Sequence, residues 1–543
     1  MKKIFTLVAA AVMALSVNAK DYTDDLAITL NGVPAAPAQA KITVNPVEGS
    51  DGLYDIVLNQ FTFAGAILIG DVTIEDVKGN STDGMDGYTY FEPITKEAAI
   101  TNAEGSFIAP QLGYKVTVTI KEGSKMSDND LYLLIELPVD YGENHFDVVA
   151  VFGTGGYQIK NSGFEYFHKA TYKDGNNEYS SDEPNAWHSF NSGVATGIWA
   201  SWTKMALQNG STSISEDVRE AWSEKTPDGT FGLSCVKIKS SVVMGSITAN
   251  GTMTTGQMEA GSLTATNAAN CAALDFTNSS VDGNGDPFYT ILNGKPDALT
   301  VWVKFKQGQE QSEYKYANVS AVITDGTRYQ DPEDKVYTNV VAKAQNKTIE
   351  SKDFTWQQLT IPFDYDTYAA NEAEAKALLV TISTNAQPGE GSKSEDNPDE
   401  LYVDDIALVY NAGLESLKIK GTDVALEEGK TDYEVSGLTG ELSLDDVVAV
   451  SDGRGAMVTK TIEAVDGGAL VTVKVTSNDY QKVNTWTINV KGVSTGIDKV
   501  ETTTENGVQA IYTIDGRQVS TMDAKGIYIV RKADGTTVKV LKK

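Results

Sequence analysis

Histidine and cysteine are scarce in this sequence. In 543 residues there are three histidines, His145, His168 and His188, and two cysteines, Cys235 and Cys271. So few nitrogen and sulfur ligands nearly exclude zinc sites and leave little material for catalysis by histidine. The chain also lacks a Gly-x-Ser-x-Gly, a His-Glu-x-x-His and a phosphate-loop motif. It therefore offers no positive evidence for an enzyme.

Basic residues and long apolar runs are also in short supply. Lysine and arginine total 44 against 74 acidic residues, which gives a net charge of −30. Such a surface repels phosphate backbones and anionic membranes, so we expect a neutral or cationic ligand and no nucleic acid. No stretch after the N-terminal segment reaches the length of a membrane span. The hydrophobic content of 41% is nevertheless sufficient for buried cores, which excludes global disorder.

The N-terminus has the pattern of a targeting segment. Lys2 and Lys3 form a positive start, residues 4–15 form an apolar run, and Val17 and Ala19 provide the small-x-small pattern. A run of 12 residues is too short to span a membrane. We therefore predict a signal peptide over residues 1–19 and export to the periplasm, the outer surface or the extracellular space.

The mature chain is predicted to be all-β. Between residues 22 and 151 the apolar residues alternate with polar ones, for example over 54–58, 114–120 and 131–137, and glycine-rich turns such as 48–52 separate the runs. This period of two predicts antiparallel strands connected as a meander. A meander of this size closes most easily into an up-and-down barrel, because closure removes the edge strands.

The first domain, residues 20–153, resembles a known family. The runs 22–31, 42–44, 54–61 and 69–72 are similar to those of the calycin-like domain of secreted Bacteroidota proteins. The resemblance implies a β-barrel. A barrel of about eight strands either holds one small ligand or is filled by its own side chains, and both alternatives stay open here.

Residues 154–411 form a second region rich in strands, glycine, asparagine and aromatic residues. It opens with an Asn-x-Gly-Phe-Glu pattern at 161–165 and closes with a strand at 401–410 that contains Asp-Asp-Ile. These look like the first and last strands of a jelly-roll carbohydrate-binding sandwich. The region resembles the Bacteroidota domain PCMD, which is associated with carbohydrate metabolism. The resemblance implies a two-sheet β-sandwich and a connection with glycans.

Two smaller segments complete the chain. The size and strand spacing of residues 412–493 fit one small sandwich of the Ig or cadherin-like type, with a spacer role. Residues 494–543 contain a strand at 510–519 with an Asp-Gly turn, a Gly-Ile-Tyr strand at 526–531 and a basic end. This order resembles the C-terminal sorting tail of Bacteroidota secretion systems. The alternative is a β-hairpin that closes the preceding domain.

Aromatic residues supply the candidate ligand contacts. Trp187, Trp199, Trp202 and Trp222 fall within 36 residues of one another. Indole faces stack on the C–H faces of sugars, so we predict a carbohydrate-binding role for these four. If Trp199 and Trp202 lie on a strand, their spacing of three places them on different faces. The alternative for each is packing in the core, where aromatic residues are common.

Calcium is the one cofactor that the resemblance implies. In jelly-roll binding modules of this type a structural calcium often joins the first and last strands, which points to Glu165 with Asp404 or Asp405. Strand alternation allows only one of these aspartates to face such a site. The loop 282–286 also offers clustered oxygens, but it departs from the calcium-loop pattern after the first residues. We expect an ordinary turn there.

The two cysteines are a disulfide candidate. Cys235 and Cys271 are 36 residues apart in one domain of a chain predicted to be exported. An oxidising compartment permits a disulfide, but only the geometry of the fold decides whether it forms.

The leading functional hypothesis is an exported, non-catalytic, modular glycan-binding protein. One alternative is a carbohydrate-active enzyme with its site in the 154–411 sandwich. Glycosidases need two carboxylates at a set separation, and 74 acidic residues offer no selection among pairs. The other alternative is a structural or adhesive surface protein that binds cell-surface components. A concave face with exposed aromatics, a deep cleft with a carboxylate pair, or a flat apolar patch would distinguish the three.

Overall fold

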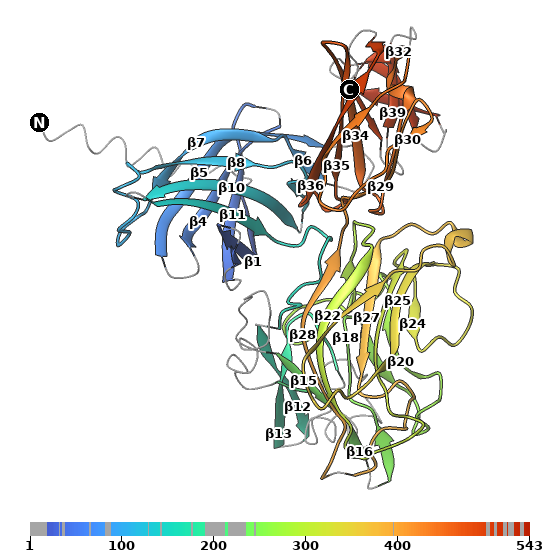
Figure 1. Cartoon of the computed structure of the whole chain (residues 1–543). Helices are drawn as coiled ribbons and strands as arrows, with labels where there is room; N and C mark the ends of the chain where they lie inside the picture. The colour runs from blue at the N-terminus through green and yellow to red at the C-terminus, as the bar shows by residue number, and fades with distance from the viewer. Residues whose placement is uncertain are drawn as a thin grey trace, which may run out of the picture.

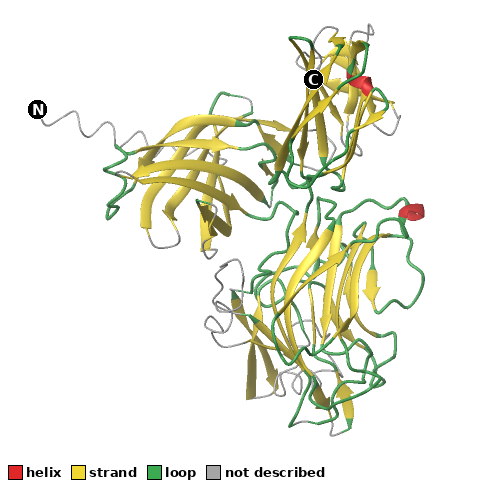
Figure 2. Cartoon of the chain, in the orientation of Figure 1, coloured by secondary structure: helices red, strands yellow, loops and turns green. Residues whose placement is uncertain are grey.

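The computed structural model of the chain consists of β-strands connected by turns (Figures 1 and 2). Its helical elements, within the part that it describes, are two single turns of 3-10 helix, Ala369–Asn371 and Leu444–Asp446. The all-β prediction is therefore confirmed. The structure describes residues 19–31, 33–34, 38–50, 52–63, 67–81, 88–128, 130–141, 144–164, 166–174, 177–189, 212–214, 235–243, 246–394, 396–495, 500–503, 508–513, 518–519, 526–532 and 537–542.

The N-terminal domain is a closed antiparallel barrel. Each strand pairs with the next along the chain, and β11 returns to pair with β1, where Phe152 lies opposite Leu26. Three short strands, β2 (Val33–Pro34), β6 (Thr89–Phe91) and β9 (Lys125–Met126), extend the rim. The ring strands are β1 (Lys20–Leu30), β3 (Ala38–Pro46), β4 (Leu53–Phe63), β5 (Ile67–Ser81), β7 (Ile94–Thr101), β8 (Lys115–Ile120), β10 (Leu131–Tyr141) and β11 (Asn144–Phe152). The predicted up-and-down connection is therefore correct.

The interior of the barrel is packed with side chains. On β8, Val116, Val118 and Ile120 are buried while Lys115 and Thr117 are exposed, as the alternation predicts. Buried aliphatic residues from all eight ring strands form one core. A cavity of about 180 Å³ remains near one end of this core.

The central domain is a two-sheet sandwich. One sheet has the order β14 (Thr212–Ile214), β15 (Val236–Lys239), β28 (Glu400–Val409), β22 (Ala298–Lys306) and β26 (Gln357–Pro362). The other has the order β18 (Thr252–Thr254), β27 (Ala377–Ser383), β23 (Ala317–Thr324) and β25 (Val340–Ile349), with β21 (Thr290–Ile291) beside β27. Inward residues of both sheets, such as Val303 on β22 and Val380 on β27, share one apolar core.

The second sheet is covered on its outer face as well, but only in part. Every residue of β27 is buried. Its outer residues Ala377 and Leu379 pack against Leu274 and Tyr329. Those two belong to a small sheet of β19 (Gln257–Ala260), β20 (Asn270–Leu274) and β24 (Tyr329–Asp331). This small sheet covers the apolar end of the outer face, and the polar end of β27 extends past it.

The opening and closing segments of the sandwich lie side by side. The backbone N–H of Ile406 donates to the carbonyl oxygen of Ser162 at 3.0 Å. The Gln158 amide donates to the Leu408 carbonyl at 2.7 Å and accepts from the Leu408 N–H at 2.8 Å. Residues 161–163 form a turn where we expected a strand. The side chain of Gln158 thus supplies hydrogen bonds that a first strand would have made with its backbone.

Two hairpins complete the described part of the sandwich. One consists of β12 (Phe167–Asp174) and β13 (Asn177–Pro184), and His168 lies opposite Glu183. The other consists of β16 (Ser241–Val243) and β17 (Ile247–Ala249) and lies directly before β18.

The C-terminal part contains a small sandwich and a further sheet. The sandwich is built from β29 (Leu414–Ile419), β30 (Thr422–Asp423), β31 (Asp432–Val435), β32 (Gly440–Leu442), β33 (Val447–Ser451), β34 (Met457–Val465), β35 (Gly468–Thr476), β36 (Val483–Lys491), β37 (Val493–Thr495) and β38 (Val500–Thr503). Its sheets enclose one core. The tail forms a four-stranded sheet, larger than the expected hairpin, from β39 (Val508–Thr513), β40 (Gln518–Val519), β41 (Gly526–Lys532) and β42 (Thr537–Lys542).

The three domains lie next to one another (Figure 1), and four tyrosine rings that we call the tyrosine joint connect them. The ring of Tyr157, which lies just after the barrel, is 5.4 Å from the ring centre of Tyr132 in the barrel. It is also 6.1 Å from Tyr410 of the central sandwich and 6.4 Å from Tyr480 of the small sandwich. Tyr132 donates a hydrogen bond to the Asp479 carbonyl oxygen at 3.3 Å. The domains therefore share buried aromatic surface at this point.

Candidate binding site on the central sandwich

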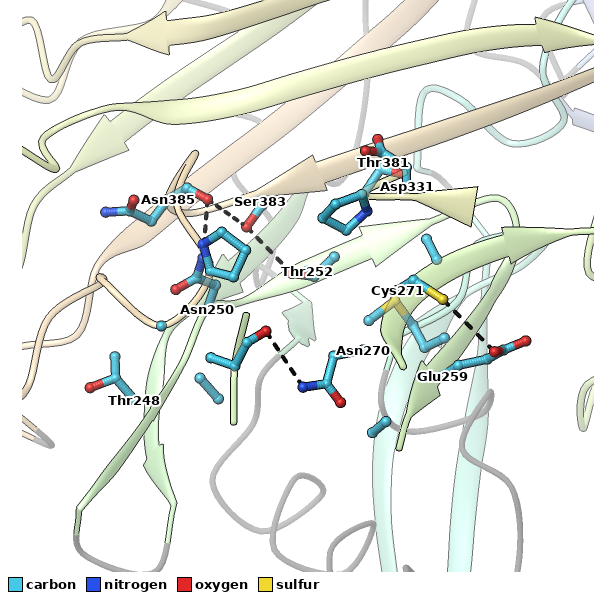
Figure 3. Close-up of a pocket in the computed structure, with 18 of the residues that line it drawn as sticks. Thr248, Asn250, Thr252, Glu259, Asn270, Cys271, Asp331, Thr381, Ser383 and Asn385 are labelled. Carbon is cyan, nitrogen blue, oxygen red and sulfur yellow. Dashed lines mark hydrogen bonds between the residues drawn. The ribbon is translucent and has the colours of Figure 1, made fainter. Parts of the chain in front are cut away.

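A pocket lies on the outer face of the second sheet, beside the small covering sheet (Figure 3). Its volume is about 150 Å³. A buried cavity of about this size is large enough for a six-membered carbon ring. The walls come from β17 to β20, from the end of β27 and from the loop after it. The polar part of the lining consists of Thr248, Asn250, Thr252, Glu259, Ser262, Asn270, Asn318, Asp331, Thr381, Ser383 and Asn385.

The strand register explains why the polar residues gather here. Ser383 on β27 lies opposite Thr252 on β18 and opposite Asn318 on β23. Thr381 is two residues before Ser383, so its side chain lies on the same face of the sheet. Three strands that are distant in the sequence thus contribute one polar surface.

Three residues of the pocket lining each have a buried polar atom that makes no hydrogen bond within the described part of the chain. These atoms are Asn250 Oδ1, Asn318 Oδ1 and Thr381 Oγ1. The amide of Asn250 is held in place because its Nδ2 donates to the carbonyl oxygens of Asn385 at 3.1 Å and Gln387 at 2.9 Å. A buried polar atom without a partner costs about 1–3 kcal/mol. A ligand whose donors reached these atoms would remove this cost.

The neighbouring polar groups are bonded to one another and fix the walls. Thr252 Oγ1 donates to Ser383 Oγ at 3.4 Å, and Ser383 Oγ donates to the Asn385 carbonyl oxygen at 3.0 Å. Asn385 Nδ2 donates to the Tyr314 carbonyl oxygen at 2.7 Å. Because these side chains are held by the protein, the pocket is formed before a ligand arrives.

The charged side of the pocket has a defined protonation pattern. Arg328 donates two hydrogen bonds to the Glu259 carboxylate, each of 3.0 Å. Burial raises the pKa of Cys271 to about 12, and the nearby Glu259 carboxylate adds to this effect. Its thiol therefore remains protonated and unreactive at neutral pH. Burial also raises the pKa of Asp331.

Of the four predicted tryptophans, one lies in the described part of the chain. Trp187 has 0% of its surface exposed and belongs to the core of the central sandwich. Its Nε1 donates to the Lys160 carbonyl oxygen at 3.1 Å, and its ring packs against Phe164 at 5.2 Å. This corrects the prediction for Trp187, because a completely buried indole offers no face to a sugar. Trp199, Trp202 and Trp222 lie outside the described residues.

Two of the three residues predicted to bind calcium, Asp404 and Asp405, lie in the described part of the chain. Glu165 lies outside the described residues. Asp404 is buried, and one of its oxygens accepts a hydrogen bond from the Asp405 N–H at 2.8 Å. A Cβ on Gly163 would lie 3.3 Å from Asp405 Oδ1, so Asp405 is the aspartate that faces the opening segment. Among the residues that are described, no group of three or more His, Cys, Asp or Glu is arranged around a metal position.

The loop 282–286, which follows β20 in the sequence, is a turn, as we expected. One oxygen of Asp282 accepts from the N–H groups of Asn284 at 2.8 Å and Asp286 at 2.9 Å.

The prediction of a disulfide between the two cysteines is wrong. Cys235 and Cys271 are both thiols, since Cys235 lies directly before β15 in the first sheet whereas Cys271 lies on β20 in the covering sheet.

The sequence reasoning missed the residues of the pocket. A signal was present in the run 377–383, where Thr381 and Ser383 occupy alternate positions at the end of an otherwise apolar strand. That pattern indicates an outer face that changes from apolar to polar. The neighbours of Thr381 and Ser383 are set by strand pairing. The pairing strands are distant in the sequence: β18 lies about 130 residues away and β23 about 60 residues away.

The comparisons with known proteins identify one part of the chain. Residues 19–155 match the family model of the calycin-like beta-barrel domain. The N-terminal barrel is therefore calycin-like, as the sequence resemblance implied. A search of the curated proteins finds no match to the chain. In the part of the chain that the structure describes, no helix has the length and apolar character needed to cross a membrane.

Proposed function

We propose that this chain is an exported, non-catalytic, glycan-binding modular protein, and that the pocket of Figure 3 holds one sugar ring. The observation that carries the proposal is the set of three buried acceptors without partners, Asn250 Oδ1, Asn318 Oδ1 and Thr381 Oγ1. Sugar hydroxyls would supply the hydrogen-bond donors that these acceptor atoms lack. Ligand sites of this kind combine an enclosed, largely apolar surface with a few fixed polar groups.

The net charge of the chain and the contacts between its domains support this proposal. The net charge of −30 disfavours anionic partners and is compatible with a neutral sugar. We propose that the barrel and the small sandwich hold the central sandwich in place through the tyrosine joint.

Export is tested by mass spectrometry of secreted protein, which should find Lys20 as the first residue. Mature protein that retains residues 1–19 would contradict the export proposal.

Glycan binding is tested with the purified chain on a glycan array. The sugar that binds is then titrated against Thr381→Val and Asn318→Leu. Each substitution removes one acceptor, so each should weaken the Kd about fivefold, since one hydrogen bond contributes about 1 kcal/mol. Thr360→Val, an exposed position on β26, is the matched control and should leave the Kd unchanged. Unchanged affinity in both pocket variants would refute the assignment of the pocket.

One observation favours catalysis as a second candidate function. Asp331 lines the pocket and burial raises its pKa, which is the direction of shift found in carboxyl groups that act as general acids. Glu259 lines the same pocket. If the pocket hydrolyses glycosides, chromatography of the bound oligosaccharide after incubation will show shorter products. Asp331→Asn would then abolish hydrolysis and retain binding, whereas intact oligosaccharide after long incubation supports the non-catalytic proposal.

A further inference from the structure

A second and much larger cavity lies between the mouth of the barrel and the central sandwich. Its volume is about 1030 Å³, and it shares no lining residue with the pocket of Figure 3. Cavities of this size at domain interfaces are frequent ligand sites. We call it the interdomain cleft.

Both walls of the interdomain cleft carry aromatic and polar groups. The barrel side contributes Tyr54, which is partly exposed, and the edges of Tyr22 and Tyr88, which are 7% and 8% exposed. The sandwich side contributes Tyr289, which is also partly exposed, and polar residues such as Asn293. A ligand that fills the cleft therefore meets an aromatic ring and hydrogen-bonding groups on each side.

The walls are held at a fixed separation by contacts between the domains. Asn293 Nδ2 donates to the Gly155 carbonyl oxygen at 2.9 Å and to the Tyr88 hydroxyl at 3.3 Å. The buried ammonium of Lys125 lies 4.3 Å from the ring centre of Tyr88 and 4.5 Å from that of Tyr157. Cation–π contacts of this length are attractive. They connect the cleft wall with the tyrosine joint, so the cleft is preformed.

The two lysines of the interdomain cleft each pair with a carboxylate. Lys20 lies 2.7 Å from Asp128, and Lys160 lies 3.5 Å from Asp24 of the barrel. The Tyr88 hydroxyl donates to the Asp130 carboxyl at 3.0 Å. The lining holds two lysines against three aspartates, so the cleft does not favour an anionic ligand. Its chemistry favours a neutral ligand with many hydroxyl groups.

We propose that the interdomain cleft binds a neutral oligosaccharide of several sugar rings, as a second site beside the single-ring pocket. A pyranose chain has apolar C–H faces, which would stack on the partly exposed rings of Tyr54 and Tyr289, and hydroxyl edges, which would face the polar groups of the lining. The cleft has several times the volume of the pocket. The ligand class rests on the proposed function, but the existence of the second site rests on the cleft alone.

The test uses isothermal titration of the chain from Lys20 to Lys543 with the oligosaccharide selected on the glycan array. Ile291 lines the cleft and is 50% exposed, so Ile291→Trp should fill the cleft without disturbing the core. Tyr54→Ala removes a ring from the opposite wall, and its fold is checked by circular dichroism. Val336→Trp, at a position that is 90% exposed and outside both cavities, is the matched control.

The wild-type chain should bind the oligosaccharide at two sites. Ile291→Trp and Tyr54→Ala should each weaken one site at least tenfold and leave the other intact, and Val336→Trp should retain both. Thr381→Val should weaken binding at the pocket of Figure 3 and leave binding at the interdomain cleft unchanged. A single site that is lost in Thr381→Val would overturn the cleft proposal and leave the proposed function standing. Two unchanged sites in Ile291→Trp would also overturn it, and the absence of any binding glycan would overturn both proposals.

Discussion

Replacing Thr381 by valine separates a structural role of this residue from a binding role. Valine has nearly the shape of threonine, so the substitution removes the hydroxyl and leaves the packing of β27 in place. A hydroxyl that supports the fold makes a hydrogen bond, and its loss destabilises the protein. Thr381 Oγ1 is buried and has no partner. We therefore expect Thr381→Val to bind sugar more weakly and yet to be at least as stable as the wild-type chain.

The size of the effect follows from the cost of an unsatisfied hydroxyl. That cost is about 1–3 kcal/mol when the group is fully desolvated. Water that enters the pocket would offset part of the cost. A gain in the free energy of unfolding of about 1 kcal/mol remains, which for a domain of this size corresponds to a rise in Tm of about 2–4 °C.

The assay is thermal unfolding by calorimetry, with and without the sugar identified on the array. The sugar should raise the Tm of the wild-type chain and raise that of Thr381→Val less, because a weaker ligand stabilises the native state less. A loss of stability above about 1 kcal/mol in the unliganded variant would refute the reasoning. It would mean that the hydroxyl holds the fold together and is not directed at a ligand.

Tyr157→Ala should cost about 3–5 kcal/mol and split the calorimetric trace into separate domain transitions, because Tyr157 is buried between rings of all three domains; one unchanged transition would contradict this. The pKa of Asp25 is raised to about 6 by burial and by its neighbour Asp24. The folded chain therefore binds more protons than the unfolded chain between about pH 4 and pH 6, and stability falls as the pH rises through that window. Asp25→Asn should flatten this dependence by about 1 kcal/mol in denaturant titrations, after allowing for solvent screening; an unaltered pH profile would count against the assignment. If calcium joins the ends of the sandwich, free calcium should raise the Tm, and Asp405→Ala should abolish that rise whereas Asp404→Ala retains it. A Tm that does not respond to a chelator would remove the calcium proposal.

Local patterns in the sequence are sufficient to predict the barrel strands. The alternation over 114–120 becomes β8, because that strand has one face on the core and one in solvent. The apolar run 131–137 becomes the first part of β10, where one face packs in the barrel and Tyr132 and Leu134 on the other face pack in the core of the central sandwich. Closure follows from the same pattern, since consecutive strands pair with their neighbours along the chain. The barrel therefore depends mainly on contacts between residues that are close in sequence.

The candidate site depends on contacts of another kind. Asn250, Asn318 and Thr381 belong to three separate segments that meet only through the register of β18, β23 and β27. Register is set by the packing of both faces of the sheet, which a single sequence does not display. Trp187 is a second example, because a single sequence does not display which side chains are buried by long-range packing. Its clustering with other tryptophans predicts a ligand contact, but the structure packs it against Phe164 in the core.

The position of Lys20 bears on how this protein should be prepared. β1 begins at Lys20, and Lys20 lines the interdomain cleft. Any peptide joined to the backbone nitrogen of Lys20 therefore begins at the rim of that cleft. An affinity tag at this end would be a tethered competitor for the cleft, present at the high effective concentration of an intramolecular ligand. Preparations with the tag at the N-terminus and at the C-terminus can accordingly differ in measured sugar affinity although their folded domains are identical.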